Sequence, residues 1–193
     1  MNKHPSVARW FAHTNALQCD ALMRDWLSNR DSLTARLQAQ CEVFRVQRLF
    51  QGRAMVLPDE YRVLNLARTE KVTAREVLLR CDEQAVVYAH TVLPLNANAS
   101  QWPLFASLGN RSLGTTLFSD PLVERGQMQY ARLRASHPLM RRVRQLGLVD
   151  AGETCYARRS LFRRKSSCLL VTEVFLPQLR EILGANELNR TNE

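Results

Sequence analysis

The chain contains few of the residues that cross-link or punctuate small proteins. Its 193 residues include 7 glycines, 7 prolines and 5 cysteines. The cysteines are odd in number and scattered, with no C-x-x-C pair, and the 4 histidines are isolated, so neither a disulfide framework nor a zinc site is expected. We see no linker and no internal repeat. We therefore expect a single domain over residues 1–193.

Long apolar runs are also absent. The longest segment without Asp, Glu, Lys or Arg extends from Gln84 to Asn110, and it contains polar side chains and two prolines. Such a segment does not cross a membrane. The N-terminus lacks the apolar stretch of a secretory signal. We expect a cytoplasmic protein that does not insert into membranes.

Lysine is scarce, because 24 of the 27 basic residues are arginines, and the net charge is +9. A basic chain can bind nucleic acid, but no zinc-finger, helix-turn-helix or aromatic RNP pattern accompanies the charge. An anionic small substrate also favours arginine, whose planar fork fits a carboxylate. No G-x-G-x-x-G or G-x-x-x-x-G-K-[ST] loop is present. We expect neither a nucleic-acid partner nor a nucleotide cofactor.

The hydrophobic periodicity changes along the chain. It predicts a helix over residues 17–30 and a shorter helix, capped by Asp31 or Ser32, that holds Leu33 and Leu37. A short helix or loop around 102–108, a helical turn after Gly109 and a C-terminal helix near 179–183 are also expected. Strands are predicted over residues 42–50, 71–80, 85–95, 122–133, 155–164 and 168–176. This order indicates an α+β fold with a largely antiparallel sheet of about six strands.

A carboxylate interrupts the most apolar strand. Glu173 shares one face of that strand with Leu169, Val171 and Phe175, and the opposite face is apolar as well. A desolvated carboxylate needs a cation or hydrogen-bond donors nearby. Glu173 is therefore either half of a structural salt bridge or a functional group in a closed pocket.

Arg75 is a second inward charge. It alternates with Thr73, Val77 and Leu79, whereas Glu76 points to the other face. The simplest alternative is that Arg75 and Glu173 bind only each other. Two inward charges of opposite sign on two apolar strands nevertheless favour a ligand site.

Six short blocks follow one another along the chain. They are Asp25-Trp26-Leu27, Asp31-Ser32-Leu33-Thr34-x-Arg36, Arg75-Glu76-Val77-Leu78-Leu79, Ser112-Leu113-Gly114-x-x-Leu117-Phe118, Arg158-Arg159-Ser160 and the run LLVTEVFLP from Leu169 to Pro177. Taken together, these blocks resemble the chorismate pyruvate-lyase family. The resemblance covers about residues 21–177. It leaves both ends of the chain unassigned.

The resemblance implies a six-stranded antiparallel sheet flanked by helices, with helical flaps over an internal aromatic-acid site. It implies removal of pyruvate from chorismate to give 4-hydroxybenzoate, the first step of ubiquinone biosynthesis, without a metal or an organic cofactor. The expected partners are thus chorismate, 4-hydroxybenzoate and pyruvate. We expect a monomer, and slow release of the aromatic product from beneath the flaps.

The resemblance also implies roles for four residues. Arg75 would bind the ring carboxylate, Glu173 would meet the ring hydroxyl, and backbone at Leu33 and Leu113 would complete the site. The family often has Met at position 33, so Leu33 affects the packing of the flap. Arg158, in the Arg-Arg-Ser block, is a further candidate for contact with a second carboxylate.

Two alternatives of other classes remain. The lyase fold resembles the effector-binding domains of bacterial transcription regulators, so the chain could be an aromatic-acid sensor. The roughly twenty residues before the matched region are too few for a DNA-binding module. Alternatively, the arginines could bind RNA or DNA, which strong salt dependence of heparin binding would reveal.

Overall fold

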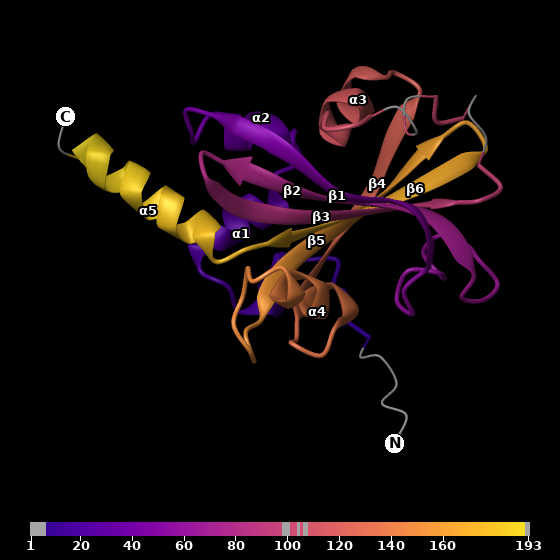
Figure 1. The fold of residues 1–193 in the computed structure, drawn as a ribbon, viewed down its shortest axis with the longest axis horizontal. Coiled ribbons are helices and arrows are strands. Elements are labelled where there is room, and N and C mark those ends of the chain that lie inside the picture. Colours follow the sequence, from indigo (N-terminus) through magenta and orange to yellow (C-terminus); the bar gives the residue numbers. More distant parts are fainter. Residues whose placement is uncertain (1–6, 98–100, 104, 106–107, 192–193) are drawn as a thin grey trace.

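The computed structural model describes residues 7–97, 101–103, 105 and 108–191, with the side chains of 115, 116 and 186–191 excepted. Its centre is a six-stranded sheet in which every neighbouring pair of strands is antiparallel (Figure 1). The strands are β1 (Phe44–Met55), β2 (Lys71–Cys81), β3 (Gln84–Pro94), β4 (Val123–Leu133), β5 (Cys155–Arg164) and β6 (Ser167–Phe175), in the spatial order β1-β2-β3-β6-β5-β4. The predicted α+β class is confirmed.

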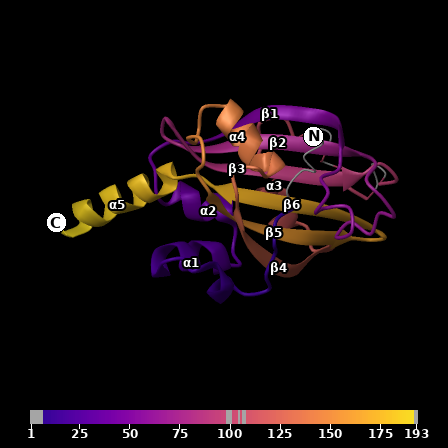
Figure 2. The ribbon, with the colours of Figure 1, turned by 90° about the horizontal axis from the view of Figure 1, so that it is seen from below.

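Six helical segments accompany the sheet in the described residues. They are η1 (Thr14–Leu17), α1 (Ala21–Ser28), α2 (Leu33–Gln38), α3 (Leu113–Ser119), α4 (Pro138–Gln145) and α5 (Gln178–Thr191). α1 and α2 lie against one face of the sheet, where their apolar residues join Val77, Ala89 and Phe175. α4 covers the opposite face, on which it packs against Leu78, Tyr88 and Val174. In both ribbon views α5 extends away from the sheet (Figure 2).

Two tight hairpins set the register of the sheet. β2 and β3 are joined at Asp82, whose φ of 52° is left-handed, and β5 and β6 are joined at Lys165, with a φ of 54°. The sequence predicted both turns. Within these hairpins Arg75 lies opposite Thr91 and Glu173 lies opposite Arg158. The long-range pairing of β3 with β6 then puts Ala89 on the other side of Glu173.

Several element boundaries differ from those predicted. The first predicted helix is split, because Gln18 adopts a left-handed φ of 51° and Asp20 then caps α1 by accepting a hydrogen bond from the Met23 N–H. β1 continues to Met55 through an irregularity between Arg48 and Phe50. α4, which begins at Pro138 behind a His137 cap, was not predicted. The segment predicted around residues 102–108 lies partly outside the described residues.

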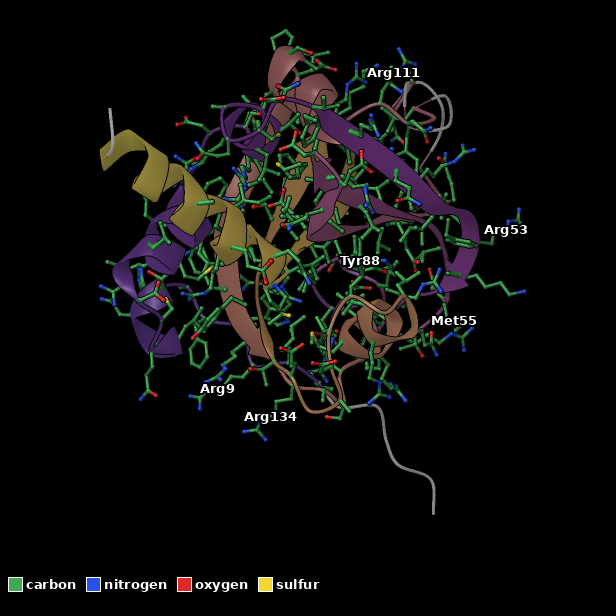
Figure 3. The ribbon with its side chains drawn as sticks, turned by 60° about the vertical axis from the view of Figure 1, so that its left-hand side comes forward. Arg9, Arg53, Met55, Tyr88, Arg111 and Arg134 are labelled. Atoms are coloured by element: carbon green, nitrogen blue, oxygen red, sulfur yellow. The ribbon has the colours of Figure 1, made fainter. Side chains whose placement is uncertain are left out.

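Charged side chains are distributed unevenly between the surface and the interior. Figure 3 shows Arg9, Arg53, Arg111 and Arg134 projecting at the periphery, whereas Tyr88 lies inside. Other arginines are buried on the two sheet faces, namely Arg75, Arg158 and Arg159, at 2%, 1% and 5% exposure. A run of arginines near 158–164 is most often solvated. Burial of Arg158 and Arg159 shows that part of this run is internal.

Candidate functional site

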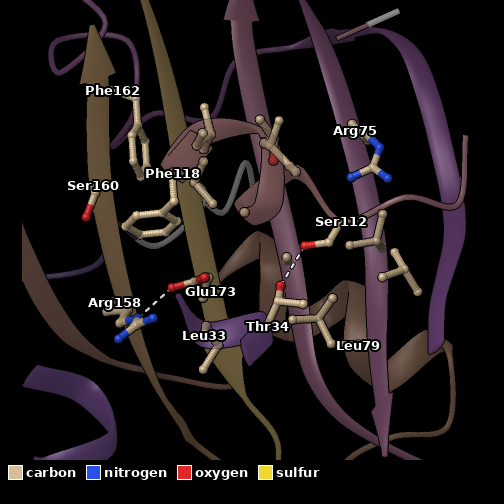
Figure 4. A pocket seen from close by; sticks show the side chains of 18 of the residues that line it. Leu33, Thr34, Arg75, Leu79, Ser112, Phe118, Arg158, Ser160, Phe162 and Glu173 are labelled. Carbon is tan, nitrogen blue, oxygen red and sulfur yellow. Dashed lines mark hydrogen bonds and ion pairs between the residues drawn. The ribbon is translucent and has the colours of Figure 1, made fainter. Parts of the chain in front are cut away.

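A cavity lies between the sheet and the helices α2 and α3, and its volume is about 610 Å³ when the open solvent at its mouth is included. The sheet supplies its floor, and residues of α2 and α3 supply its roof (Figure 4). Its walls are mostly apolar. The polar side chains that line it are Thr34, Arg75, Thr91, Ser112, Arg125, Arg158, Ser160 and Glu173.

All four residues that the sequence singled out for the site line this cavity: Leu33, Arg75, Leu113 and Glu173. They come from α2, β2, α3 and β6, which are far apart in the chain. The strand alternation predicted that Arg75 and Glu173 each point inward, and the pairing of both strands with β3 puts them on the same face of the sheet.

Arg75 is a buried cation in which the guanidinium Nη2 donates to the carbonyls of Gly109 and Arg111, at 3.0 and 2.9 Å. Its buried Nε has no hydrogen-bond partner, and no ion pair includes it among the described residues. Burial, together with the charge of Arg48, lowers the pKa of Arg75 to about 10. A positive charge held dry in this way is suited to an anion with two oxygens.

Glu173 is paired with Arg158 rather than with Arg75. The Arg158 Nε donates to Glu173 Oε2 at 2.5 Å, and 17% of the Glu173 side chain is exposed. The alternative in which Arg75 and Glu173 bind only each other is therefore wrong. Glu173 is thus part of a structural salt bridge and also lines the cavity.

The sheet register gives the spacing between the two inward charges. Arg75 and Glu173 are separated by two strand spacings and by two residues along the strand. This arrangement puts their Cα atoms about 12 Å apart, since strands lie about 4.8 Å apart and rise about 3.3 Å per residue. One aromatic ring fits between the ends of two such side chains.

Two flaps cover the cavity side of the sheet, the first formed by α1 and α2 and the second by α3. Arg158 anchors the first flap to the sheet. Its Nη1 donates to the carbonyls of Trp26, Leu27 and Asn29 at the C-terminal end of α1, at 3.2, 3.4 and 2.7 Å. These carbonyls lack partners within the helix, so a cation there is favourable. The Arg158 guanidinium thus joins Glu173 to the end of α1.

The matched Asp-Trp-Leu and Asp-Ser blocks hold the flaps together. Arg36 of α2 forms an ion pair with Asp25 of α1, and its guanidinium lies 4.0 Å from the centre of the Trp26 ring. Between α2 and α3, the hydroxyls of Thr34 and Ser112 are 2.6 Å apart.

Leu33 and Leu113 are the first residues of α2 and α3. At this position a helix has a backbone N–H without an intrahelical acceptor. Such groups can donate to a ligand from the roof of the cavity. Because the backbone rather than the side chain would act, Leu in place of Met at position 33 changes only the packing.

Arg125 lines the cavity, but the sequence interpretation missed it. Its Nε donates to Ser160 Oγ at 2.9 Å, and its Nη1 donates to the carbonyl of Arg30 at 2.8 Å. A β-bulge between Arg125 and Met128 reverses the alternation of β4 and so turns Arg125 toward the cavity. Gly126, inside an otherwise regular strand pattern, was the available signal for a bulge.

The opposite face of the sheet holds a different set of charges, most of them buried. Asp59 Oδ2 accepts from the Trp10 Nε1 at 2.8 Å and lies 3.2 Å from His137 Nε2. The other two pairs are Glu60 with His90, at 3.4 Å, and Glu76 with Arg142, at 2.8 Å. Hydrogen bonds from His137 and Trp10 keep the pKa of Asp59 below its usual value, although burial alone would raise it.

Two searches of the described part of the chain gave negative results. It contains no group of three or more His, Cys, Asp or Glu side chains placed to hold a metal ion. It also contains no helix that is both long and apolar enough to cross a membrane.

Proteins of similar sequence are named for one activity. The chain is 50% identical over 157 residues to "Probable chorismate pyruvate-lyase" of Ralstonia nicotianae, covering 80% of each protein. It is 41% identical over 183 residues to the protein of the same name from Nitrosomonas eutropha, covering 94% of this chain and 100% of that protein.

Solved structures of similar shape belong to regulators. The effector domain of PhnF from Mycobacterium smegmatis matches with a TM-score of 0.53 at 16% identity, over 78% of this chain and 91% of that one. The C-terminal domain of the histidine utilization repressor from Pseudomonas syringae matches with a TM-score of 0.51 at 12% identity, over 70% and 93%. At these identities the likeness concerns the fold alone.

The family comparison agrees with the relatives. A family model described as "Chorismate lyase" matches residues 4–182, a longer span than the resemblance recognised from the six blocks. Together with relatives at 41–50% identity, this match confirms the family expected from the sequence. The chain belongs to the chorismate lyase family.

Proposed function

We propose that this protein eliminates pyruvate from chorismate and leaves 4-hydroxybenzoate, the first step of ubiquinone biosynthesis. The observation that carries the proposal is Arg75, a buried guanidinium without an ion pair among the described residues, in a cavity that also contains Glu173. Membership of the chorismate lyase family supports it.

Arg75 is proposed to bind the ring carboxylate of chorismate. The charge is desolvated and its Nε lacks a partner, so a carboxylate would restore both a hydrogen bond and charge balance. The same side chain holds the carbonyls of Gly109 and Arg111, just before α3. An anion on Arg75 would therefore lie next to the Leu113 N–H, which can complete its binding.

Glu173 is proposed to meet the ring hydroxyl at the other side of the ring. In the reaction, the C–H bond at the hydroxyl-bearing carbon and the C–O bond of the enolpyruvyl ether both break, and a ring double bond forms. The leaving enolpyruvate takes up a proton and becomes pyruvate. We propose that Glu173 orients the hydroxyl and transfers a proton, while aromatisation provides much of the driving force.

The flaps are proposed to close over the aromatic ring. Leu33 and Leu113 contribute backbone N–H groups, and the contact between Thr34 and Ser112 holds the two flaps together. Release of the product would then require the flaps to separate, which can limit turnover. If 4-hydroxybenzoate does not inhibit at concentrations near that of chorismate, the closed flap is the wrong picture.

The proposed reaction assigns no role to a metal ion or an organic cofactor. The monomeric state and the lack of a nucleic-acid partner stay predictions. Gel filtration tests the first. Retention on heparin at different salt concentrations tests the second, since contacts with several phosphates give steep salt dependence.

The decisive experiment is incubation of the purified protein with chorismate, without added metal or cofactor, followed by chromatography of the products. Equal amounts of 4-hydroxybenzoate and pyruvate are expected, at a rate far above that of chorismate alone. Tight binding of 4-hydroxybenzoate without turnover would replace the proposal with a sensor. If the protein neither converts chorismate nor binds 4-hydroxybenzoate, both the lyase proposal and the sensor alternative are wrong.

A further inference from the structure

Chorismate has two carboxylates, and Arg75 accounts for one of them under the proposed function. The second carboxylate is on the enolpyruvyl group and departs with pyruvate. It would enter a mostly apolar cavity, where an unpaired carboxylate is costly. A second cation is therefore required, and two more arginines line the cavity, Arg125 and Arg158.

Arg158, the candidate suggested by the sequence, is already engaged. Its Nε is paired with Glu173, and its Nη1 is shared by three carbonyls at the end of α1. Its charge is thus neutralised by a carboxylate, and its position is fixed by the flap. A second carboxylate at Arg158 would have to compete with Glu173.

The Arg125 guanidinium has more hydrogen-bond donors than its described acceptors use. Among the described residues, two of its donors are used, by Ser160 Oγ and by the carbonyl of Arg30, whereas a guanidinium has five. Among the described residues it forms no ion pair within 4.0 Å. Burial lowers its pKa, and the nearby charge of Glu173 opposes that effect.

The Arg125 side chain is also held in place. Its guanidinium carbon lies 5.6 Å from the centre of the Phe118 ring and 5.5 Å from that of Phe162. Cation–π contacts of this kind orient the planar group. Phe118 belongs to α3 and Arg30 follows α1, so the fixed guanidinium touches residues from both sides of the flap region.

The backbone of β4 is shaped to turn this side chain inward. Arg125 pairs with Phe162 and Met128 pairs with Ser160, so two residues of β4 lie opposite Leu161 alone. One of them is Gly126, where a Cβ atom would lie only 3.0 Å from the Leu161 carbonyl oxygen. A side chain there would push the strands apart, and the glycine therefore allows the bulge.

The register places Arg125 across the cavity from Arg75. Arg75, Thr91, Val171 and Ser160 form one row across four strands. The row separates the Cα atoms of Arg75 and Ser160 by about 14 Å, or three strand spacings. Arg125 is hydrogen-bonded to the Ser160 hydroxyl, so Arg75 and Arg125 lie on opposite sides of the cavity. Strand β6, which carries Glu173, runs between them.

We infer that Arg125 binds the enolpyruvyl carboxylate of chorismate and thereby selects substrate over product. The inference rests on the proposed function. As the C–O bond breaks, its electron pair moves onto the enolpyruvyl oxygen, and the fixed cation beside this group stabilises that charge. The product 4-hydroxybenzoate has only the ring carboxylate, so it gains nothing from Arg125.

The test compares binding of one- and two-carboxylate ligands by Arg125→Met, measured by calorimetry. The probes are 4-hydroxybenzoate and 3-(carboxymethoxy)benzoate, an unreactive ether with a second carboxylate. We expect Arg125→Met to weaken binding of the dicarboxylate by about 30-fold or more, because a desolvated charge-assisted pair is lost. The affinity for 4-hydroxybenzoate should change less than about threefold. Arg125→Lys should recover part of the loss.

Steady-state kinetics provides the second readout. With chorismate, Arg125→Met should lose about 30-fold or more in kcat/KM, with the larger part of the loss in KM. The matched control is Arg163→Met, which removes an equal charge from an exposed position on β5, outside the cavity. It should retain wild-type kinetics.

Three results would overturn the inference. They are an equal loss of affinity for both probes, an unchanged affinity for the dicarboxylate, and an equal effect of Arg163→Met. If Arg125→Met does not fold, Arg125→Lys and Arg125→Gln supply the same comparison. The binding measurement does not need turnover, so it tests Arg125 even if the wild-type protein does not convert chorismate.

Discussion

On the sheet face that carries α4, each of three carboxylates has a basic partner, and the buried Arg159 lies near two of them, Asp59 and Glu60. On the face beneath the flaps, by contrast, two arginines that line the cavity have no anionic partner within 4.0 Å among the described residues. Asp59 meets His137, Glu60 meets His90, and Glu76 meets Arg142. Among the described residues, the hydrogen bonds of Arg75 and Arg125 go to carbonyl and hydroxyl groups.

This difference distinguishes charges that stabilise the fold from charges that serve ligand binding. A buried pair balances its own desolvation, at least in part, and serves the folded state. A buried cation without an anion is costly in the free protein, and that cost is recovered when an anionic ligand binds. Glu173 lies between these two cases, because it is paired with Arg158 and yet lines the cavity.

Replacement of Arg75 should give the largest effect on activity. We expect Arg75→Met to lower kcat/KM by about a thousandfold, since a buried charge pair with substrate is worth several kcal/mol. The free energy of unfolding should change by less than about 1 kcal/mol, because the lost hydrogen bonds are offset by removal of a desolvated charge. Kinetics with chorismate and urea denaturation measure the two quantities.

Arg75→Lys is the matched control for that variant. It keeps the charge but loses the planar fork, so its activity should fall between those of wild type and Arg75→Met. Activity of Arg75→Met within about tenfold of wild type would remove Arg75 from the proposed site.

A substitution on the opposite face should lower stability and leave activity unchanged. Asp59→Ala leaves the Trp10 and His137 donors without their acceptor, so it should cost about 3 kcal/mol in free energy of unfolding. The folded fraction should keep its kcat/KM. The exposed Asp150, replaced by Ala, is the control for loss of the same charge. A parallel loss of activity in folded Asp59→Ala would show that the faces are not independent.

Glu173→Gln tests the residue that combines both roles. Gln keeps the shape of the side chain but neither transfers the proton nor neutralises Arg158, so turnover should fall by about a hundredfold. Thermal melting shows whether the variant is folded. Near-full turnover would eliminate the acid–base role and leave Glu173 with the salt bridge alone.

The smallest expected effect is a pH dependence of stability at His90. Burial alone would lower the pKa of His90, but the carboxylates of Glu60, Glu76 and Asp59 outweigh it and raise the pKa above 6.5. Because the folded-state pKa is the higher one, this contribution to stability is fully present below pH 6.5 and is lost as the pH rises through the folded-state pKa.

Melting temperatures measured from about pH 5 to about pH 9 test this expectation. The comparison is between the wild type and Glu60→Gln, in which the main cause of the raised pKa is removed. The wild type should lose more stability than the variant as the pH rises above neutrality. Identical slopes would show that the pair of Glu60 and His90 does not contribute.

Much of the sheet face beneath the flaps was predictable from the sequence. Alternation along the strand is a local property, so the apolar neighbours of Arg75 and Glu173 were sufficient to show that both side chains point inward. The two hairpin turns are local as well, and they set the pairing of β2 with β3 and of β5 with β6, whereas the pairing of β3 with β6 is long-range. The blocks around Leu33 and Leu113 placed the flaps through their resemblance to a family.

The partners of the charges were decided by tertiary structure. Arg158 was a candidate for contact with a carboxylate of the substrate, but in the folded chain it is paired with Glu173 and buried beneath the carbonyls at the end of α1. The orientation of Arg125 depends on a bulge, and a bulge exists only where a second strand fixes the register. α4 was missed because it is short and is stabilised by packing rather than by its own length.

The sequence by itself thus determined the α+β class, the family, and the inward direction of Arg75 and Glu173, because periodicity and turns act over a few residues. Only the tertiary structure decided which carboxylate meets which arginine and which cations remain without one. Those outcomes depend on segments that are distant in the chain, such as Glu76 and Arg142 or Trp26 and Arg158, and that meet only in the folded protein.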